Sequence, residues 1–189
     1  GGRKIVAYFE FDPKASQELE VKVALSGVST AGALKNLQTE AASAGFDELA
    51  SRASNTWNKA LSVIEANGND DQLAMLYTSL YHTMINPCVY TDVDGQYRGI
   101  DQNIHTADGF TNYTVFSVWD TYRALHPLFN IINRQVNTDI AKSMMKHAEQ
   151  SVHKILPIWS HMANENWCMI GYHSVSVLAD AIAKGLPID

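Results

Sequence analysis

The spacing of apolar residues changes once along this chain, close to Gly27. Before that point, Lys4–Phe11 is rich in β-branched and aromatic residues, and Leu19–Leu25 alternates apolar with charged side chains, the pattern of a strand with one solvated face. After it, apolar residues recur every three to four positions, as on amphipathic helices. Two strands cannot bury a face alone, so we expect their partner sheet outside this chain. Strands followed by helices predict an α+β fold or two domains, and we favour two domains.

Capping and breaking residues divide the helical part into segments. Ser29 or Thr30 can cap the first helix, Gly45 ends it, and Gly185 follows the last helix. An Asp-Gly turn predicts a hairpin over Tyr90–Gly99. The other expected elements are helices at Asp47–Ile64, Asp71–Asn86, Val118–Asn130 (capped by Ser117) and Val136–Val152, a short strand at Asn112–Phe116, a loop over Leu156–Met169 and a last helix carrying Val175–Ile182.

Composition excludes several classes of partner and site. The net charge is −6 and no cluster of five or more Lys or Arg occurs, which argues against nucleic-acid binding. No apolar run approaches the ~18 residues of a membrane span, and the first residues lack the apolar core of a signal peptide. Cys88 and Cys168 have neither zinc-site nor disulfide-framework spacing. Asp92–Gly95 lacks the Gly and Glu positions of a calcium-binding EF-hand loop, so we interpret it as a hairpin turn.

Four motifs together are similar to one enzyme family. Their order and spacing resemble glycoside hydrolase family 92, the calcium-dependent exo-α-mannosidases, from about residue 20 to residue 185. The motifs are Val23–Ser29 with Ala33–Leu37 and Glu40; Leu76–His82 with Asp92–Gly99; Phe116–Leu128, which contains Val-Trp-Asp-Thr-Tyr-Arg; and Asn164–His173 with Val177–Ala181.

The resemblance implies a multi-domain architecture of which this chain holds a part. Residues 1–28 would be the end of a β-sandwich, residues 29–68 a helical linker, and residues 69–189 the N-terminal part of a truncated (α/α)6 barrel. The remainder of that barrel would then be the main partner of this chain. The family also implies a bacterial protein that is secreted, periplasmic or on the cell surface.

The activity that the resemblance implies is hydrolysis of terminal α-mannosides of glycans, with inversion. Inversion requires one carboxylic acid to protonate the leaving oxygen and a second carboxylate to activate water on the opposite face of the sugar. The family carries this pair, and most ligands of its Ca²⁺, in Gly-Asn-Glu-Pro-Ser-His-His and Gly-Asn-Asp-Asp type segments, which are absent here. We therefore expect neither a catalytic residue nor a metal ligand in this segment, and no turnover by it alone.

Six residues are candidates for binding the terminal mannose. Asp120 lies at the start of an expected helix, where it can accept hydrogen bonds from adjacent sugar hydroxyls or simply complement the helix dipole. Trp119 is either a sugar contact or a core residue, and Arg123 is expected to pair with Asp120. The other three lie in the last motif, in or next to its polar loop: Glu165, Cys168 and His173. Asp180, inside the last helix, is interpreted as structural.

Two other functions stay open at this point. The absent acid–base pair and the aromatic content, with four Trp and eight Tyr, suit a non-catalytic carbohydrate-binding or structural segment. A weaker alternative is another helical-barrel carbohydrate enzyme, such as a phosphorylase relative, which would depend on phosphate.

Overall fold

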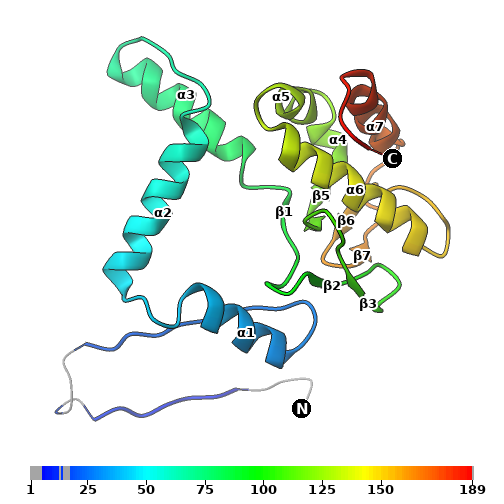
Figure 1. The fold of residues 1–189 in the computed structure, drawn as a ribbon. Coiled ribbons are helices and arrows are strands. Elements are labelled where there is room, and N and C mark those ends of the chain that lie inside the picture. Colours follow the sequence, from blue (N-terminus) through cyan, green and yellow to red (C-terminus); the bar gives the residue numbers. More distant parts are fainter. Residues whose placement is uncertain (1–5, 13, 15–17, 189) are drawn as a thin grey trace.

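The computed structural model describes residues 6–12, 14 and 18–188, and this part of the chain is mainly helical (Figure 1). The strands are short and form three small antiparallel sheets, ordered β1-β4, β2-β3 and β5-β6-β7. The elements are α1 (Thr30–Glu40), α2 (Phe46–Leu61), α3 (Asp70–Thr83), β1 (Cys88–Val89), β2 (Gln96–Arg98), β3 (Ile104–Thr106), β4 (Tyr113–Thr114), β5 (Phe116–Ser117), α4 (Val118–Thr121), α5 (Leu125–Ile132), α6 (Arg134–Gln150), β6 (Trp159–His161), β7 (Asn164–Glu165) and α7 (His173–Ala183).

The segment predicted as a strand at Leu19–Leu25 is extended chain without a ladder partner among the described residues. Its alternating side chains are exposed, with Val23 at 79% and Leu25 at 84%. A strand requires a hydrogen-bonded neighbour, and the described part of the chain brings none alongside this segment. The segment is instead held against the end of α1 by Lys22, whose Nζ donates to the carbonyl oxygen of Ala44 at 2.7 Å. The first predicted strand is also wrong over residues 6–11, which form no strand in the described structure, and its residues Lys4 and Ile5 lie outside the described residues.

The helices after this segment begin within a residue or two of the positions that the sequence predicts. The Ser29 hydroxyl accepts a hydrogen bond from the Gly32 N–H at 3.0 Å, which confirms it as the cap of α1. Asn69 caps α3 and forms a reciprocal capping box with Gln72. The third helix ends at Thr83 rather than at the predicted Asn86. Figure 1 shows α2 and α3 standing apart from the body formed by α4–α7.

The predicted hairpin over Tyr90–Gly99 is wrong in its strand pairing, although its turn forms. The Gly95 N–H donates to the Asp92 carbonyl oxygen at 2.9 Å, and Gly95 has a φ of +83°, which glycine adopts without strain. β2 then pairs with β3 rather than with the residues before the turn. The residues before the turn are hydrogen-bonded to a different segment, because β1 pairs with β4 and the Tyr90 N–H donates to the Asn112 carbonyl oxygen.

The single helix predicted over Val118–Asn130 is also wrong, because the chain forms α4 and then α5. Pro127 explains the break: in one continuous helix its ring would clash with the carbonyl group of Arg123, four residues earlier. Ser117 does not cap the helix as predicted, since its hydroxyl donates to the Asp120 carboxylate instead. The predicted loop over Leu156–Met169 contains β6 and β7, which are joined by a tight turn at Met162 and Ala163.

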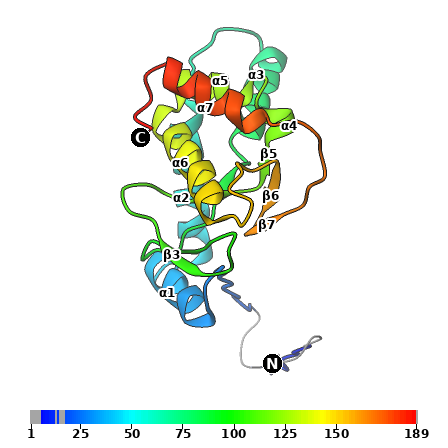
Figure 2. The ribbon, with the colours of Figure 1, turned by 90° about the vertical axis from the view of Figure 1, so that its right-hand side faces the viewer.

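The core lies where α5, α6 and α7 pack on the short strands β4 and β5, and Figure 2 shows α7 crossing the upper part of α6. The cap predicted at Gly185 is confirmed, since this residue has a φ of +71° and its N–H donates back to Ile182. None of the described helices is long and apolar enough to cross a membrane. The buried cluster consists of Phe116, Val118, Phe129, Ile140, Met144 and Val177.

A chain of polar side chains joins the three helices inside this core. His126 Nδ1 donates to Asn137 Oδ1 at 2.8 Å, and Asn137 Nδ2 donates to Asn130 Oδ1. Asn130 Nδ2 donates in turn to Asp180 Oδ2 on α7 at 2.8 Å. Lys184 pairs with the same carboxylate oxygen, and its hydrogen bond lowers the pKa of Asp180. The carboxylate therefore terminates the chain, and Asp180 has the structural role predicted from its position.

Replacing Asn137 by Leu is expected to destabilise the fold by about 3 kcal/mol, because it leaves His126 Nδ1 and Asn130 Oδ1 buried without partners. Urea denaturation measures the loss. Glu149→Ala, at an exposed position of the same helix whose surface ion pair with Lys146 contributes little, is the matched control and should stay within about 0.5 kcal/mol of the wild type. Equal denaturation midpoints for the two variants would contradict a stabilising role of the polar chain.

Candidate functional site

Four side chains from α4, the turn after it and the start of α7 form one surface cluster, which we call the α4–α7 cluster: Trp119, Tyr122, Arg123 and His173. His173 stacks on Tyr122 with their ring centroids 4.1 Å apart and their planes at 5°, and it meets Trp119 edge-on at 6.3 Å. The Arg123 guanidinium lies 5.0 Å from the centre of the Trp119 ring and 5.2 Å from that of Tyr122. Cation–π contacts of this kind orient an arginine without using all of its N–H donors.

Asp120 lies on the same helix with one oxygen engaged. Its Oδ2 accepts the Ser117 hydroxyl at 2.6 Å, and the residue is exposed. The predicted ion pair between Arg123 and Asp120 does not form in the described structure, because the guanidinium lies over the aromatic rings instead. Asp120 Oδ1 has no partner among the described residues. An exposed carboxylate oxygen beside aromatic rings is suited to accept hydrogen bonds from sugar hydroxyls.

Glu165 is placed differently, with its carboxylate turned into the protein. Oε1 accepts the N–H of Trp159 at 2.8 Å and that of Trp167 at 3.2 Å, and Oε2 accepts the N–H of Ile158 at 3.0 Å. The side chain is 7% exposed, and His147 Nε2 lies 3.8 Å from Oε2. The carboxylate is thus occupied by the loop that surrounds it.

The loop that follows Glu165 is exposed at its tip. Trp167 is 52% exposed and has a φ of +56°, a left-handed conformation that is costly for a tryptophan. Cys168 is exposed and is a free thiol. Neither ring nitrogen of His173 has a hydrogen-bond partner among the described residues, so both are available to a ligand. The structure thus places Trp119, Arg123 and His173 together, with Asp120 next to Trp119 on α4. Glu165 ends β7, and Cys168 lies in the loop that leads from β7 to His173 at the start of α7.

Sequence reasoning missed Tyr122 and His147. Tyr122 lies inside the Trp-Asp-Thr-Tyr-Arg motif, and its position one residue before Arg123 was a usable signal. His147 carried no such signal, because its neighbours Ser160 and Glu165 are 13 and 18 residues away in the sequence. His147 Nδ1 lies 3.3 Å from Ser160 Oγ, and burial lowers the pKa of His147, while the Glu165 charge acts in the opposite direction.

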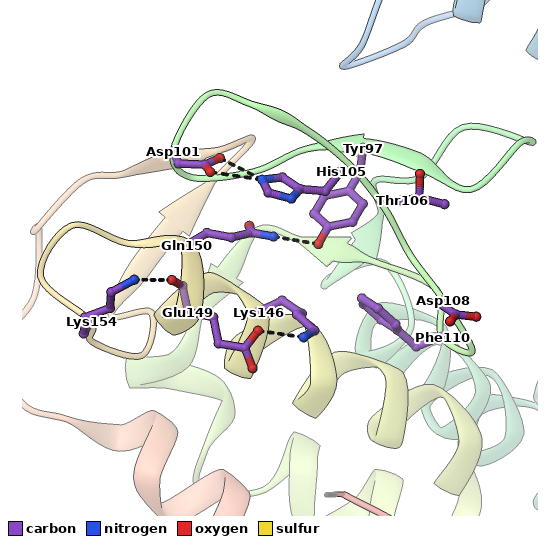
Figure 3. Close-up of a pocket in the computed structure, with 10 residues that line it drawn as sticks. All are labelled: Tyr97, Asp101, His105, Thr106, Asp108, Phe110, Lys146, Glu149, Gln150 and Lys154. Atoms are coloured by element: carbon purple, nitrogen blue, oxygen red, sulfur yellow. Dashed lines mark hydrogen bonds and ion pairs between the residues drawn. The ribbon is translucent and has the colours of Figure 1, made fainter.

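A separate polar cavity of about 640 Å³ lies between the β2–β3 hairpin and the C-terminal end of α6 (Figure 3). None of the residues predicted as site residues lines it. Several of its polar groups are paired with one another: Gln150 Nε2 donates to the Tyr97 hydroxyl at 2.8 Å, and His105 Nε2 lies 3.0 Å from Asp101. Burial raises the pKa of Tyr97, which keeps its hydroxyl protonated. We therefore place the candidate site at the α4–α7 cluster, where unpaired groups face solvent.

The described residues contain no group of three or more His, Cys, Asp or Glu side chains that would hold a metal ion. Asp92 illustrates the point, because its two carboxylate oxygens accept hydrogen bonds from Asn36 Nδ2 at 2.9 Å and from the Ser26 hydroxyl at 2.6 Å. Asp94, two residues on, pairs with Lys35. This segment is therefore a turn that anchors α1.

Comparison with known proteins connects this chain to one family. A model of the glycosyl hydrolase family 92 catalytic domain matches residues 32–189. Over 85% of its length the chain is 52% identical to a family GH92 α-mannosidase from Bacteroides thetaiotaomicron, with a TM-score of 0.83, and that enzyme has also been solved in complex with mannoimidazole. Over 87% of its length it is 32% identical to a family GH92 inverting mannosidase from the same organism, with a TM-score of 0.80. The chain spans 22% of the length of each relative. A search of curated proteins found no match.

Stability is expected to fall as the pH drops below about 6.5, because the pKa of buried His147 is lower in the folded than in the unfolded chain. Above that pH the imidazole is neutral in both states and costs nothing; below it, protonation favours the unfolded chain until the folded-state pKa is passed. Thermal unfolding between pH 7.5 and 5 measures the effect, and His147→Gln should lose less stability over this range than the wild type. The exposed His82, replaced by Gln, is the control. Identical pH profiles for His147→Gln and the wild type would contradict the prediction.

Proposed function

The chain belongs to glycosyl hydrolase family 92, and from that membership we propose that it is part of a longer exo-α-mannosidase that removes terminal α-mannosides with inversion. The observation that carries the proposal is the family match over residues 32–189. Two findings support the substrate and the stereochemistry: the 52% identical relative is described as an α-mannosidase and binds mannoimidazole, and the 32% identical relative is described as inverting.

The α4–α7 cluster is proposed to bind the terminal mannose. The exposed carboxylate of Asp120 would accept hydrogen bonds from adjacent hydroxyls, and Trp119 would cover the apolar face of the ring. Arg123, which is held over the aromatic rings, keeps N–H donors free for sugar oxygens. His173 would donate to a further hydroxyl, and Cys168 would contact the sugar from the adjoining loop.

The inverting step itself is assigned to residues outside this chain. The general acid and the general base would flank the bound mannose from the remaining part of the barrel, and this chain would hold the sugar in place for them. We propose that ligands outside this segment would hold Ca²⁺, which would bind sugar hydroxyls and fix the orientation of the ring. The residues of this chain contribute binding and orientation.

The partners that follow from the proposal are a mannose-containing glycan and the remainder of the same barrel. Exposed apolar side chains of the described helices, such as Phe46 at 76% and Ile131 at 72%, support further protein packing against them. We propose a secreted, periplasmic or cell-surface location, where glycans are accessible.

The stereochemistry and the metal dependence are tested directly on the complete protein. NMR of freshly released mannose should show the β-anomer first, before mutarotation. Treatment with a chelator should abolish activity, and added Ca²⁺ should restore it. Release of the α-anomer would contradict inversion, and full activity after chelation would contradict the calcium proposal. A complete protein that binds mannosides without hydrolysing them would favour the non-catalytic alternative.

Asp120→Ala is expected to lower kcat/KM for an α-mannoside by about a hundredfold or more, because unpaired sugar hydroxyls in a closed site cost about 1–3 kcal/mol each. Thermal unfolding should hardly change, since the residue is exposed and bonded only to Ser117. Glu65→Gln, at an exposed acid after α2, is the matched control and should leave kcat/KM unchanged. Wild-type kinetics for Asp120→Ala would remove this residue from the site.

A further inference from the structure

Glu165 was expected to contact the sugar, but its carboxylate is committed elsewhere. A carboxylate offers about four acceptor positions, and three are taken by the N–H groups of Ile158, Trp159 and Trp167. His147 also faces the carboxylate, with its Nε2 3.8 Å from Oε2. A buried charge is tolerated when hydrogen bonds replace its water, so these contacts account for the burial of Glu165 without any ligand.

These hydrogen bonds connect two points of the chain that flank a hairpin. Ile158 and Trp159 lie at the start of β6, whereas Trp167 follows β7. The carboxylate therefore closes the base of the β6–β7 hairpin, as a clamp. Asn166 strengthens the same closure, because its N–H and its side-chain amide both donate to the Trp159 carbonyl oxygen, at 3.2 and 2.9 Å.

The Glu165 carboxylate also stabilises Trp167, whose backbone conformation is energetically unfavourable. Trp167 has a left-handed φ of +56°, and such conformations persist where surrounding contacts over-determine them. The Glu165 carboxylate accepts the N–H of this residue directly. The side chain of Trp167, half exposed, also meets the His153 ring edge-on at a centroid distance of 5.7 Å. Loss of the carboxylate would free the peptide group that sets the direction of the loop tip.

We infer that Glu165 is a positioning residue, which holds the loop of Trp167 and Cys168 at the proposed mannose site without touching the sugar. The inference rests on the proposed function. It extends the proposed function by giving two acidic residues of this segment, Asp120 and Glu165, different roles. Asp120 binds the substrate through an open oxygen, whereas Glu165 acts through the backbone of the loop.

The test compares Glu165→Gln and Glu165→Ala in the complete protein. Gln keeps one acceptor oxygen but turns an amide N–H₂ toward the other donors, so it retains part of the clamp, and Ala retains none. We expect a graded loss of kcat/KM, about ten- to a hundredfold for Ala, because small displacements of positioning groups have effects of this size. Amide hydrogen exchange in residues 158–167 should become faster in the same order. Glu149→Gln, at an exposed acid on α6, is the matched control.

A series of monodeoxy α-mannosides separates positioning from direct contact. A positioning residue lowers kcat/KM by the same factor for every member of the series. Its effect is also non-additive with Trp167→Ala, since both variants disturb the same loop. Loss confined to the substrates that retain one particular hydroxyl, with unchanged hydrogen exchange, would show direct sugar contact and overturn the inference.

The same measurements distinguish failure of the inference from failure of the proposed function. A wild-type protein that hydrolyses no α-mannoside and does not bind mannoimidazole overturns the proposed function, and the positioning role with it. An active wild type whose Glu165→Ala variant keeps both its kcat/KM and its hydrogen exchange overturns the inference alone.

Discussion

The hydrogen-bonded chain from His126 to Asp180 is the constraint on which the C-terminal body depends. It crosses from α5 to α6, back to α5 and on to α7, through Asn137 and Asn130. Each amide can donate only from nitrogen and accept only at oxygen, so the terminal carboxylate sets the direction of the whole chain. A one-residue slip of any of the three helices would rotate a member by about 100° and leave buried groups without partners, at about 1–3 kcal/mol each. The same direction places the hydrogen of His126 on Nδ1 and leaves Nε2 as a buried, unpaired acceptor, and burial lowers the pKa of this histidine.

The position of the α4–α7 cluster follows from that constraint. α4 is separated from α5 by only the short turn that Pro127 imposes, so fixing α5 also fixes Trp119 and Tyr122. His173 begins α7, and fixing α7 brings its ring onto Tyr122. The cluster is therefore assembled by packing in the core below it. A surface that is assembled in this way would need little reorganisation to bind the proposed sugar ligand.

Two carboxylates close to this surface show how environment assigns different roles to the same chemical group. Asp120 is exposed and has one oxygen without a protein partner, whereas Glu165 is 7% exposed and accepts three backbone hydrogen bonds. The first can exchange water for sugar hydroxyls at little cost. The second would have to give up the contacts that make its burial tolerable. Under the proposed function, the acids of this segment therefore divide between the ligand and the backbone of the loop after β7.

Local signals in the sequence identified the family and some of the helix boundaries. The caps predicted at Ser29 and Gly185 are correct because their hydrogen bonds span only a few residues. Gly45, by contrast, does not end the first helix as predicted, because α1 ends at Glu40 and Gly45 directly precedes α2. Four motifs in order were sufficient to identify family 92, a prediction that the family match confirms. The boundary between α4 and α5 was not predicted, because the apolar residues recur with helical spacing across Pro127 and this repeat outweighed the proline as a signal.

Only the tertiary structure decided what the charged side chains of the site contact. Arg123 lies over aromatic rings instead of pairing with Asp120, because the packing of α7 brings His173 and Tyr122 together beside it. Glu165 faces His147 because β6 and β7 fold back onto α6. The extended segment Leu19–Leu25 has no strand partner among the described residues, although its own sequence has the pattern of a strand. Contacts between residues distant in the sequence depend on how the elements pack, and a pattern of neighbouring residues does not record that packing.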